Sequence, residues 1–386
     1  MKYEKKFCVC LLFIVLCSLF FSNCLDNENK ELHHPIDSYM PDYKKAVSTD
    51  DEGYQIADVV IDSVLGFFQS SEKQFQLGGT TSHDLLGNVK DLTTDSSGNI
   101  YILDNRTYSI RKYDSGGNLL KIYGGVQGRG PNDLFRPIAV DVSSESVLYQ
   151  SDYPHPFKAY DVSEDKLDFL QTYEPKNIIT TDFCLMNDEV YVRSLAENPN
   201  VEDSLVYNLI HVFSQSDIEF ITAFGDMYNS PRLKTNKRLS GGLNGKVACI
   251  ENTNTIVYTF ESFNYLYATD QKGELKWVAN LSSLTPFQSI EKVHNGQTRG
   301  WRFRYKGDRI TTINQVNSDY ILVQAIRNKE GTEPVEVVSY LVSVKNGSNV
   351  ELDVELPRII HIDLEKKIYF VLHVDQDIRV EVWKNE

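Results

Sequence analysis

A four-strand pattern that recurs along the chain restricts the possible folds more than any other feature of the sequence. In its clearest copy, four short runs rich in β-branched and aromatic residues alternate with turn signals. These runs are 89–92, 100–103, 109–113 and 119–123. The turns at 95–99 and 114–118 contain glycine and asparagine, which supply the positive φ angles of tight hairpins. The copy is therefore predicted to be a four-stranded antiparallel meander.

The pattern recurs after this copy, and the last repeat is one strand short. The later copies occupy 137–173, 190–224, 256–278, 320–356 and 368–383. The missing strand is available near the N-terminus, because residues 73–79 resemble the outer strand 119–125. We therefore predict an all-β fold, a six-bladed β-propeller of four-stranded antiparallel blades that is closed by an N-terminal strand. The 22 tyrosines and 19 phenylalanines are expected to pack between blades.

Residues 1–23 have the properties of a secretory signal peptide. Three lysines precede the apolar run 7–21, which is shorter than the roughly 20 residues of a membrane-spanning helix. The run ends in Phe21-Ser22-Asn23-Cys24, which resembles a bacterial lipobox. We expect Cys24 to be lipidated and to become the mature N-terminus, and a plain secreted protein is the alternative.

The sequence after the leader divides into two parts. Residues 24–55 are polar and acidic, and are predicted to form a flexible tether. Residues 56–386 are predicted to form the propeller. The net charge is −15, and removal of the leader leaves about −17, because the leader carries three lysines and one glutamate. Such an acidic chain repels phosphate backbones, so nucleic acid is a poor partner unless basic residues cluster, and none is predicted.

Only two cysteines lie beyond Cys24, and their spacing fits no metal site. Cys184 and Cys249 occupy matching positions on the first strands of adjacent repeats. First strands of neighbouring blades are expected to diverge around the propeller axis, whereas a disulfide needs Cα atoms within roughly 7 Å. We therefore predict two buried free thiols.

The first repeat carries a resemblance to a known family. Asp104-Asn105-Arg106, Ile110 to Asp114, Tyr123-Gly124-Gly125 and Phe135-Arg136-Pro137 resemble an NHL-type repeat. With its lipobox, the whole chain resembles the six-bladed propeller lipoproteins of Bacteroides-type bacteria. This resemblance implies an exported protein that is lipid-anchored to the outer membrane and faces the periplasm or the outside. It implies no catalytic residue.

One face of the predicted propeller carries its long segments. We call it the crossover face, because it holds the crossings between blades and the loops between second and third strands. Long segments there are 124–136, 193–206, 225–245 and 279–310. Ligands usually bind to such loops on rigid scaffolds. Basic residues are concentrated in two of the four, and arginine pairs well with carboxylates, sulfates and phosphates. The candidate ligand-binding residues are Arg129, Arg232, Lys234, Arg238, Arg299, Trp301, Arg302 and Arg304.

The same residues have a structural interpretation. The arginines could pair with neighbouring acidic loops, and Arg302 and Arg304 alternate with aromatic residues as in an ordinary strand with one wet face.

The evidence for catalysis is weak. No G-x-S-x-G, H-E-x-x-H or phosphate-binding loop is present. The acids of the first strands, Asp91, Asp141, Asp182 and Glu251, are weak metal candidates. Asp91 and Asp141 are expected to cap a strand or turn instead. No catalytic residue and no cofactor are predicted, and a calcium or zinc ion in the channel is the alternative.

We therefore predict a binding module of the cell envelope, attached to the membrane only through its lipid. Its ligand is expected on the crossover face and is an anionic saccharide, a peptide or another envelope protein. The alternatives are a metal-dependent hydrolase or lyase with channel carboxylates, and a purely structural scaffold.

Overall fold

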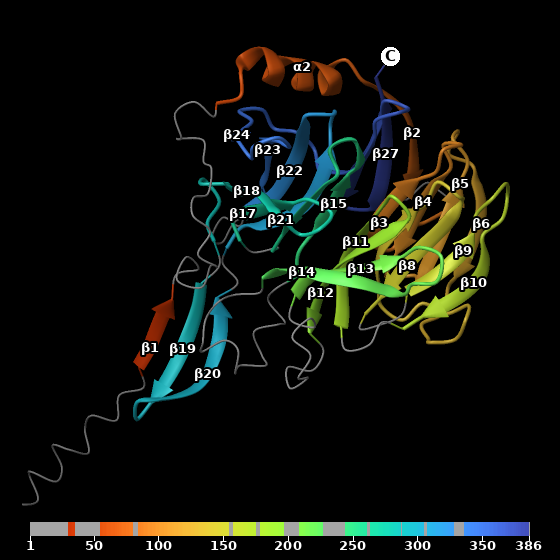
Figure 1. Cartoon of the computed structure of the whole chain (residues 1–386). Coiled ribbons are helices and arrows are strands. Elements are labelled where there is room, and N and C mark those ends of the chain that lie inside the picture. The colour runs from red at the N-terminus through yellow and green to blue at the C-terminus, as the bar shows by residue number, and fades with distance from the viewer. Residues whose placement is uncertain are drawn as a thin grey trace, which may run out of the picture. The chain divides into compact units, whose positions relative to one another are not determined.

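The computed structural model describes residues 30–34, 55–79, 84–153, 157–174, 178–196, 208–226, 244–260, 263–286, 288–304, 307–327 and 336–385. The chain divides into two compact units. One unit consists of Met1–Ser38 with Phe287–Tyr305, and the other of Tyr39–Pro286 with Lys306–Glu386. The larger unit contains six four-stranded sheets, and the smaller unit contains one three-stranded sheet (Figure 1).

The six sheets are antiparallel and follow one another along the chain, as predicted. The first blade contains β3 (Val89–Thr94), β4 (Ile100–Asp104), β5 (Ser109–Tyr113) and β6 (Leu119–Gly124). The second contains β7 (Pro137–Val142), β8 (Val147–Asp152), β9 (Phe157–Asp161) and β10 (Asp168–Tyr173). The third contains β11 (Ile178–Met186), β12 (Glu189–Ala196), β13 (Asn208–Ser214) and β14 (Phe220–Asp226). The fourth and fifth are β15 (Val247–Ile250), β16 (Thr255–Thr259), β17 (Tyr265–Thr269) and β18 (Leu275–Asn280); and β21 (Arg309–Gln315), β22 (Tyr320–Arg327), β23 (Glu336–Ser343) and β24 (Asn349–Glu351).

The sixth blade joins the two ends of the larger unit. It contains β25 (Ile359–Asp363), β26 (Ile368–Val374) and β27 (Ile378–Lys384), and its fourth strand is β2 (Glu72–Gly78). Leu77 of β2 pairs with Val380 of β27 in an antiparallel register. The prediction of an all-β six-bladed propeller closed by an N-terminal strand is therefore confirmed.

The first strand of each blade lies at the centre of the ring. Consecutive first strands contact one another in the order β3, β7, β11, β15, β21 and β25, and β25 contacts β3 again. Tight turns join the first and second strands of a blade. In the turn after β3, Gly98 has a φ of 86° and Asp95 Oδ1 accepts a hydrogen bond of 2.9 Å from the Asn99 N–H.

The core lies between neighbouring blades, where the apolar and aromatic side chains of one sheet pack against those of the next. Tyr101, Tyr160 and Tyr191 are completely buried. The rings of Tyr123 and Tyr160 meet edge to face with centroids 4.5 Å apart. The prediction that tyrosine packs between blades is thus confirmed for Tyr123 and Tyr160, which belong to β6 and β9.

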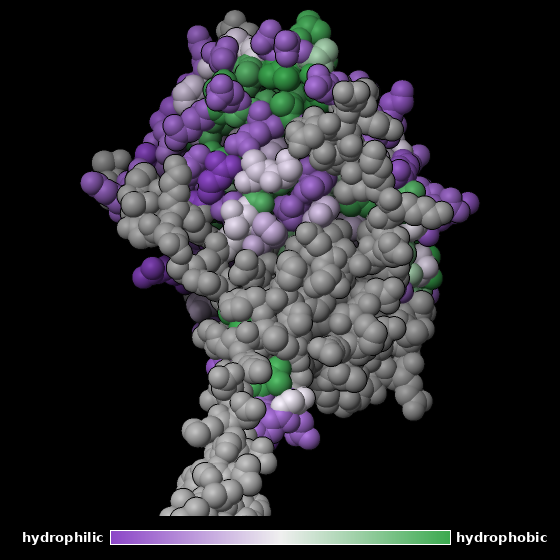
Figure 2. All heavy atoms as spheres, turned by 90° about the vertical axis from the view of Figure 1, so that its left-hand side faces the viewer, coloured by the Kyte–Doolittle hydropathy of each residue, from purple (hydrophilic) through white to green (hydrophobic). Residues whose placement is uncertain are grey.

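One helix, α2 (Asp58–Gln69), was not predicted from the sequence. Its buried residues are Val64 and Phe68, and the Phe68 ring packs edge to face on Tyr369 with centroids 5.1 Å apart. The pattern of apolar residues spans only three turns and is interrupted by polar residues, which explains why it gave no clear helical signal. Figure 2 shows hydrophobic residues gathered among hydrophilic ones at the height of α2 in Figure 1.

The smaller unit contains β1 (Lys30–His34), β19 (Gln288–His294) and β20 (Gln297–Arg304) in the order β1-β19-β20. Residues 288–304 are therefore a hairpin, and the prediction of a long loop over 279–310 is wrong for this part. Asn295 and Gly296 have φ angles of 52° and 70°, as a two-residue type I′ turn requires. This Asn-Gly pair was the sequence signal for the hairpin. Residues 30–34 of the predicted tether form β1.

Candidate functional site

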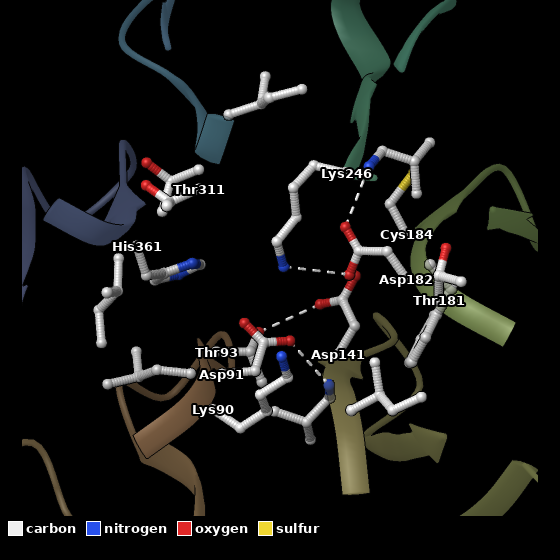
Figure 3. Close-up of a pocket in the computed structure, with 18 of the residues that line it drawn as sticks. Lys90, Asp91, Thr93, Asp141, Thr181, Asp182, Cys184, Lys246, Thr311 and His361 are labelled. Carbon is white, nitrogen blue, oxygen red and sulfur yellow. Dashed lines mark hydrogen bonds and ion pairs between the residues drawn. The ribbon is translucent and has the colours of Figure 1, made fainter. Parts of the chain in front are cut away.

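A large cavity lies at the centre of the propeller. Its volume is about 1160 Å³, and residues of the first strands of all six blades line it. Figure 3 shows side chains of Asp91, Asp141, Asp182 and Lys246 that point toward one another within it. We call this space the central cavity.

Bulges shape the wall of the central cavity. In five of the six first strands, one residue interrupts the pairing with the second strand. The residues at these interruptions are Lys90, Ile138, Thr181, Thr311 and Ile360, and all of them line the cavity. A bulge redirects the side chains that follow it along a strand, and bulges are common at functional sites.

Three carboxylates in the cavity join neighbouring blades. Asp91 Oδ2 accepts the Val140 N–H at 2.9 Å, so β3 is held to β7. Asp182 Oδ2 accepts the Val247 N–H at 3.0 Å, and this bond links β11 to β15. These two acids thus satisfy backbone donors of the adjacent strand.

Asp141 has the richest set of hydrogen bonds among these acids. Its Oδ1 accepts from the Val142 N–H at 2.9 Å and from Thr93 Oγ1 at 3.1 Å, and its Oδ2 accepts from the Leu185 N–H at 3.3 Å. Asp141 therefore connects the first three blades.

The fourth metal candidate lies elsewhere. Glu251 is exposed and begins the short helix η4 (Glu251–Thr253), outside the residues that line the cavity. Within the described ranges, no group of three or more His, Cys, Asp or Glu side chains could hold a metal ion.

The protein surroundings favour the neutral forms of two cavity acids. Removal from bulk water raises the pKa of Asp91 to about 6, and the negative charge of Asp182 adds to this rise while Lys246 opposes it. Removal from bulk water likewise raises the pKa of Asp141 to about 7 against the effect of its hydrogen bonds. Both groups therefore titrate close to neutral pH.

His361 lies on β25, which is the neighbour of β3 in the ring, and it lines the same cavity (Figure 3). Burial lowers its pKa to about 4, against the effect of the Asp363 carboxylate. Its imidazole is accordingly neutral at pH 7, and its Nε2 lies 3.3 Å from Thr94 Oγ1.

These shifts predict an unusual pH dependence of stability. Asp141 has a folded-state pKa of about 7 and an ordinary value of 3.8, so the folded chain binds more protons than the unfolded chain between these pH values. The free energy of unfolding should therefore fall as the pH rises from 4 to 7. Asp141→Asn should reduce this fall by about 2 kcal/mol, after allowance for water in the cavity.

Urea unfolding of both proteins at pH 5, 6, 7 and 8 would measure the effect. His361 has the opposite effect on the free energy of unfolding, because its pKa is about 4 in the folded chain and 6.5 in the unfolded chain. The unfolded chain therefore binds more protons at this residue below pH 6.5. This contribution is the same in the wild type and in Asp141→Asn. Parallel pH profiles for wild type and Asp141→Asn would contradict the assignment.

Basic residues lie where several first strands begin on the crossover side. Arg136 directly precedes β7, Lys246 precedes β15, Arg358 precedes β25, and Lys90 is the second residue of β3. All four line the central cavity, and we call them the basic rim. Lys246 Nζ lies 3.5 Å from Asp182 Oδ1.

Arg358 differs from the other members of the basic rim. Its Nε is buried and has no hydrogen-bond partner, and no ion pair to it is found in the described part of the chain. Burial and the positive charge of Arg309 both lower the pKa of Arg358. Its environment is thus costly for a cation and supplies no counter-charge.

The binding residues predicted from the sequence are spread over two units. Arg129 is exposed on the larger unit, with its guanidinium 4.9 Å from the centroid of the Phe135 ring. Arg299 is exposed on β20 of the smaller unit, and Trp301, Arg302 and Arg304 lie on the same strand. Arg232, Lys234 and Arg238 lie outside the described residues.

Sequence reasoning missed the basic rim. A signal was present, since Arg136, Lys246 and Arg358 each stand immediately before a first strand. Recognising it requires the blades to be aligned at the starts of their inner strands, and the lengths of the loops do not report this alignment.

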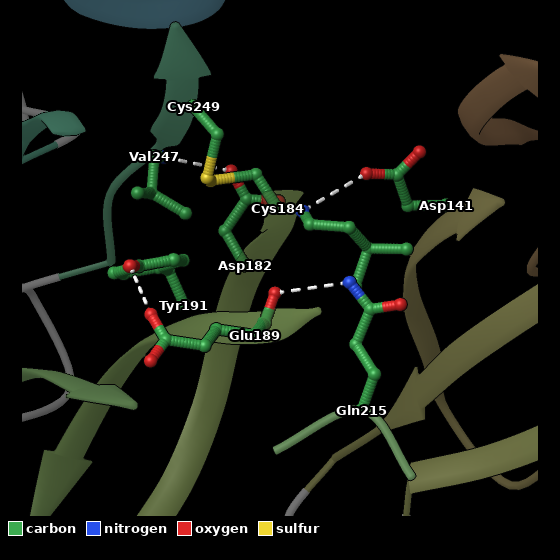
Figure 4. The surroundings of a disulfide bond; sticks show 9 residues. Asp141, Asp182, Cys184, Glu189, Tyr191, Gln215, Val247 and Cys249 are labelled. Carbon is green, nitrogen blue, oxygen red and sulfur yellow. Dashed lines mark hydrogen bonds between the residues drawn. A yellow bond between two sulfur atoms is a disulfide. The ribbon is translucent and has the colours of Figure 1, made fainter. Parts of the chain in front are cut away.

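The two remaining cysteines form a disulfide, so the prediction of free thiols is wrong (Figure 4). Cys184 on β11 and Cys249 on β15 have Cα atoms 5.7 Å apart and line the central cavity. The two strands do not diverge at this level, because Asp182 accepts the Val247 N–H and holds β15 against β11.

The ring of six blades and its central cavity define this chain as a six-bladed β-propeller with a polar cavity on its axis. A solved Bacteroides fragilis protein, named for its expected export, aligns with a TM-score of 0.50 at 11% identity over 82% of this chain and 96% of that chain. A DUF4221 family member from Bacteroides vulgatus gives 0.49 at 10% identity, over 81% and 97% of the two chains. Streptogramin B lyase gives 0.47 at 11% identity, over 78% and 83%.

At such identities the likeness shows the fold alone. No protein-family model and no curated protein matches the sequence. Within the residues that the structure describes, no helix combines the length and the apolar character needed to cross a bilayer. The lipobox and the NHL-type repeat remain predictions.

Proposed function

We propose that this chain is an exported binding protein whose ligand occupies the central cavity and enters from the crossover face. The observation that carries the proposal is the cavity of about 1160 Å³, which all six first strands line. This volume is in the range of small-molecule sites, which are concave, preformed and equipped with a few convergent polar groups. A rigid ring supplies such groups in fixed positions, because each first strand is packed between two others.

The chemistry of the wall suits a polar ligand. Lys246, Asp141 and Thr311 offer a cation, a carboxylate and a hydroxyl from three different blades. The three cavity acids already accept backbone or side-chain hydrogen bonds, which suits a binding wall better than a metal-dependent site. Of the ligands expected from the sequence, an anionic saccharide or a peptide fits a cavity of this size.

A blocked cavity tests the proposal. Thr311→Trp places a large ring at a bulge in the cavity wall, whereas Thr172→Trp places it on the exposed outer strand β10. Both variants and the wild type would be applied to an array of neutral and acidic oligosaccharides and short peptides. We expect the wild type and Thr172→Trp to retain the same ligands and Thr311→Trp to lose them. Equal binding by Thr311→Trp, or no binding by the wild type, would contradict the proposal.

We also propose that Cys24 carries lipid and anchors the protein to the outer membrane. The lipobox-like Phe21-Ser22-Asn23-Cys24 after a leader-type apolar run supports this. Cells expressing the full chain and supplied with radiolabelled palmitate should label the wild type, and Cys24→Ser should remain unlabelled and leave the membrane fraction. Equal labelling of both chains would show that Cys24 is not the lipid attachment site.

A further inference from the structure

Basic residues outnumber acidic ones in the central cavity, whereas acidic residues outnumber basic ones in the whole chain. The protein has a net charge of −15, yet the four residues of the basic rim line the cavity together with three acids. A cavity with this balance attracts an anion into an otherwise acidic protein.

The guanidinium of Arg358 is the group to which an anion would bind. Other arginines of the larger unit form close ion pairs: Arg327 with Glu336 at 3.2 Å and with Glu351 at 3.3 Å, and Arg379 with Asp375 and Asp377, each at 2.8 Å. Arg358 has no such pair among the described residues, although its Nε is buried. The charge of Arg309 nearby makes its position still more favourable for a bound anion.

The acids limit the anion to a single charge. Asp91 belongs to β3, whose blade is adjacent to that of Arg358, and Asp141 lies one blade further around the ring. Their carboxylates would repel a dianion such as a phosphate monoester, while a carboxylate carries one charge and matches the planar guanidinium fork. Their remaining lone pairs can accept hydrogen bonds from ligand hydroxyls.

We propose that the central cavity binds a carboxylate-bearing saccharide, whose carboxylate pairs with Arg358 and whose hydroxyls donate to Asp91 and Asp141. This assignment rests on the proposed function and names its ligand class. It also moves the expected anion site from the long crossover loops to the start of β25.

Calorimetric titration with glucuronate, glucose and glucose 6-phosphate tests the assignment. These probes share a ring and differ in one group, which is a carboxylate, a hydroxymethyl or a dianionic phosphate ester. We expect the wild type to bind glucuronate roughly tenfold or more tightly than either of the others, as a charge-assisted hydrogen bond allows. Arg358→Gln should lose this preference and Arg358→Lys should keep part of it.

Arg106→Gln is the matched control, because it removes the same charge from an exposed residue that does not line the cavity. It should leave all three affinities unchanged. Should Arg358→Gln not fold, the salt dependence of the wild type decides, since sodium chloride should weaken the binding of glucuronate and not that of glucose.

Equal affinities of the wild type for glucuronate and glucose, or an unchanged preference in Arg358→Gln, would overturn the assignment. Tighter binding of glucose 6-phosphate would also overturn it, in favour of a phosphate site. The proposed function would survive these results if Thr311→Trp abolished the binding of whichever probe binds. If glucuronate binds Thr311→Trp as well as it binds the wild type, both proposals fail.

Discussion

Replacement of both Cys184 and Cys249 by serine should lower the free energy of unfolding by about 4 kcal/mol. The disulfide closes a loop of 65 residues, and the loop-closure entropy of the unfolded chain gives this magnitude. It also joins the first strands of the third and fourth blades, so it resists the separation of these blades when the ring opens.

Urea unfolding of the oxidised wild type, the reduced wild type and the double variant would measure the effect. The last two should agree, because both lack the same link. A reduced protein as stable as the oxidised one would show that the link contributes nothing. Peptide mapping without reductant should recover the two cysteines in one linked pair.

Leu77→Asp should destabilise the fold by about 4 kcal/mol or more, because it buries a charge in the strand that closes the ring. Leu77 is 3% exposed and packs with Leu372, Val380 and Val382 of the last blade. Without β2, the edge of β27 would be open and the ring would have two free ends.

Gln74→Asp is the control for this variant, because Gln74 is exposed on the same strand. It should change the free energy of unfolding by less than about 0.5 kcal/mol. Circular dichroism during urea unfolding would compare the two. Similar midpoints for both variants would mean that the ring holds together without the packing of β2.

Features that depend on local sequence could be predicted. Gly98 and Asp95 specify a hairpin wherever the chain places them, and the outer-strand pattern of 73–79 reveals the closing strand without knowledge of its partner. Both signals lie within a few neighbouring residues. The count of six blades follows from adding such signals along the chain.

Features that depend on distances between blades could not be predicted. The Cα atoms of Cys184 and Cys249 are close because first strands pack side by side around the axis, and no local pattern reports this distance. The role of Arg358 depends in the same way on Arg309 and on the acids of other blades. β1 is a further case, since its partner β19 comes more than 250 residues later.

The closing strand also sets the order in which the molecule can be assembled. Lys73 of β2 bonds with Glu381 of β27, which is made 308 residues later. At a rate of synthesis of about 5–20 residues per second, β27 is made roughly 15–60 seconds after β2. The strand β2 carries three exposed charged or polar residues, which are Glu72, Lys73 and Gln74. Such residues on an unpaired strand discourage pairing with other chains. The ring can therefore close only after the whole propeller sequence has been made, because its last blade needs strands from both ends of the propeller.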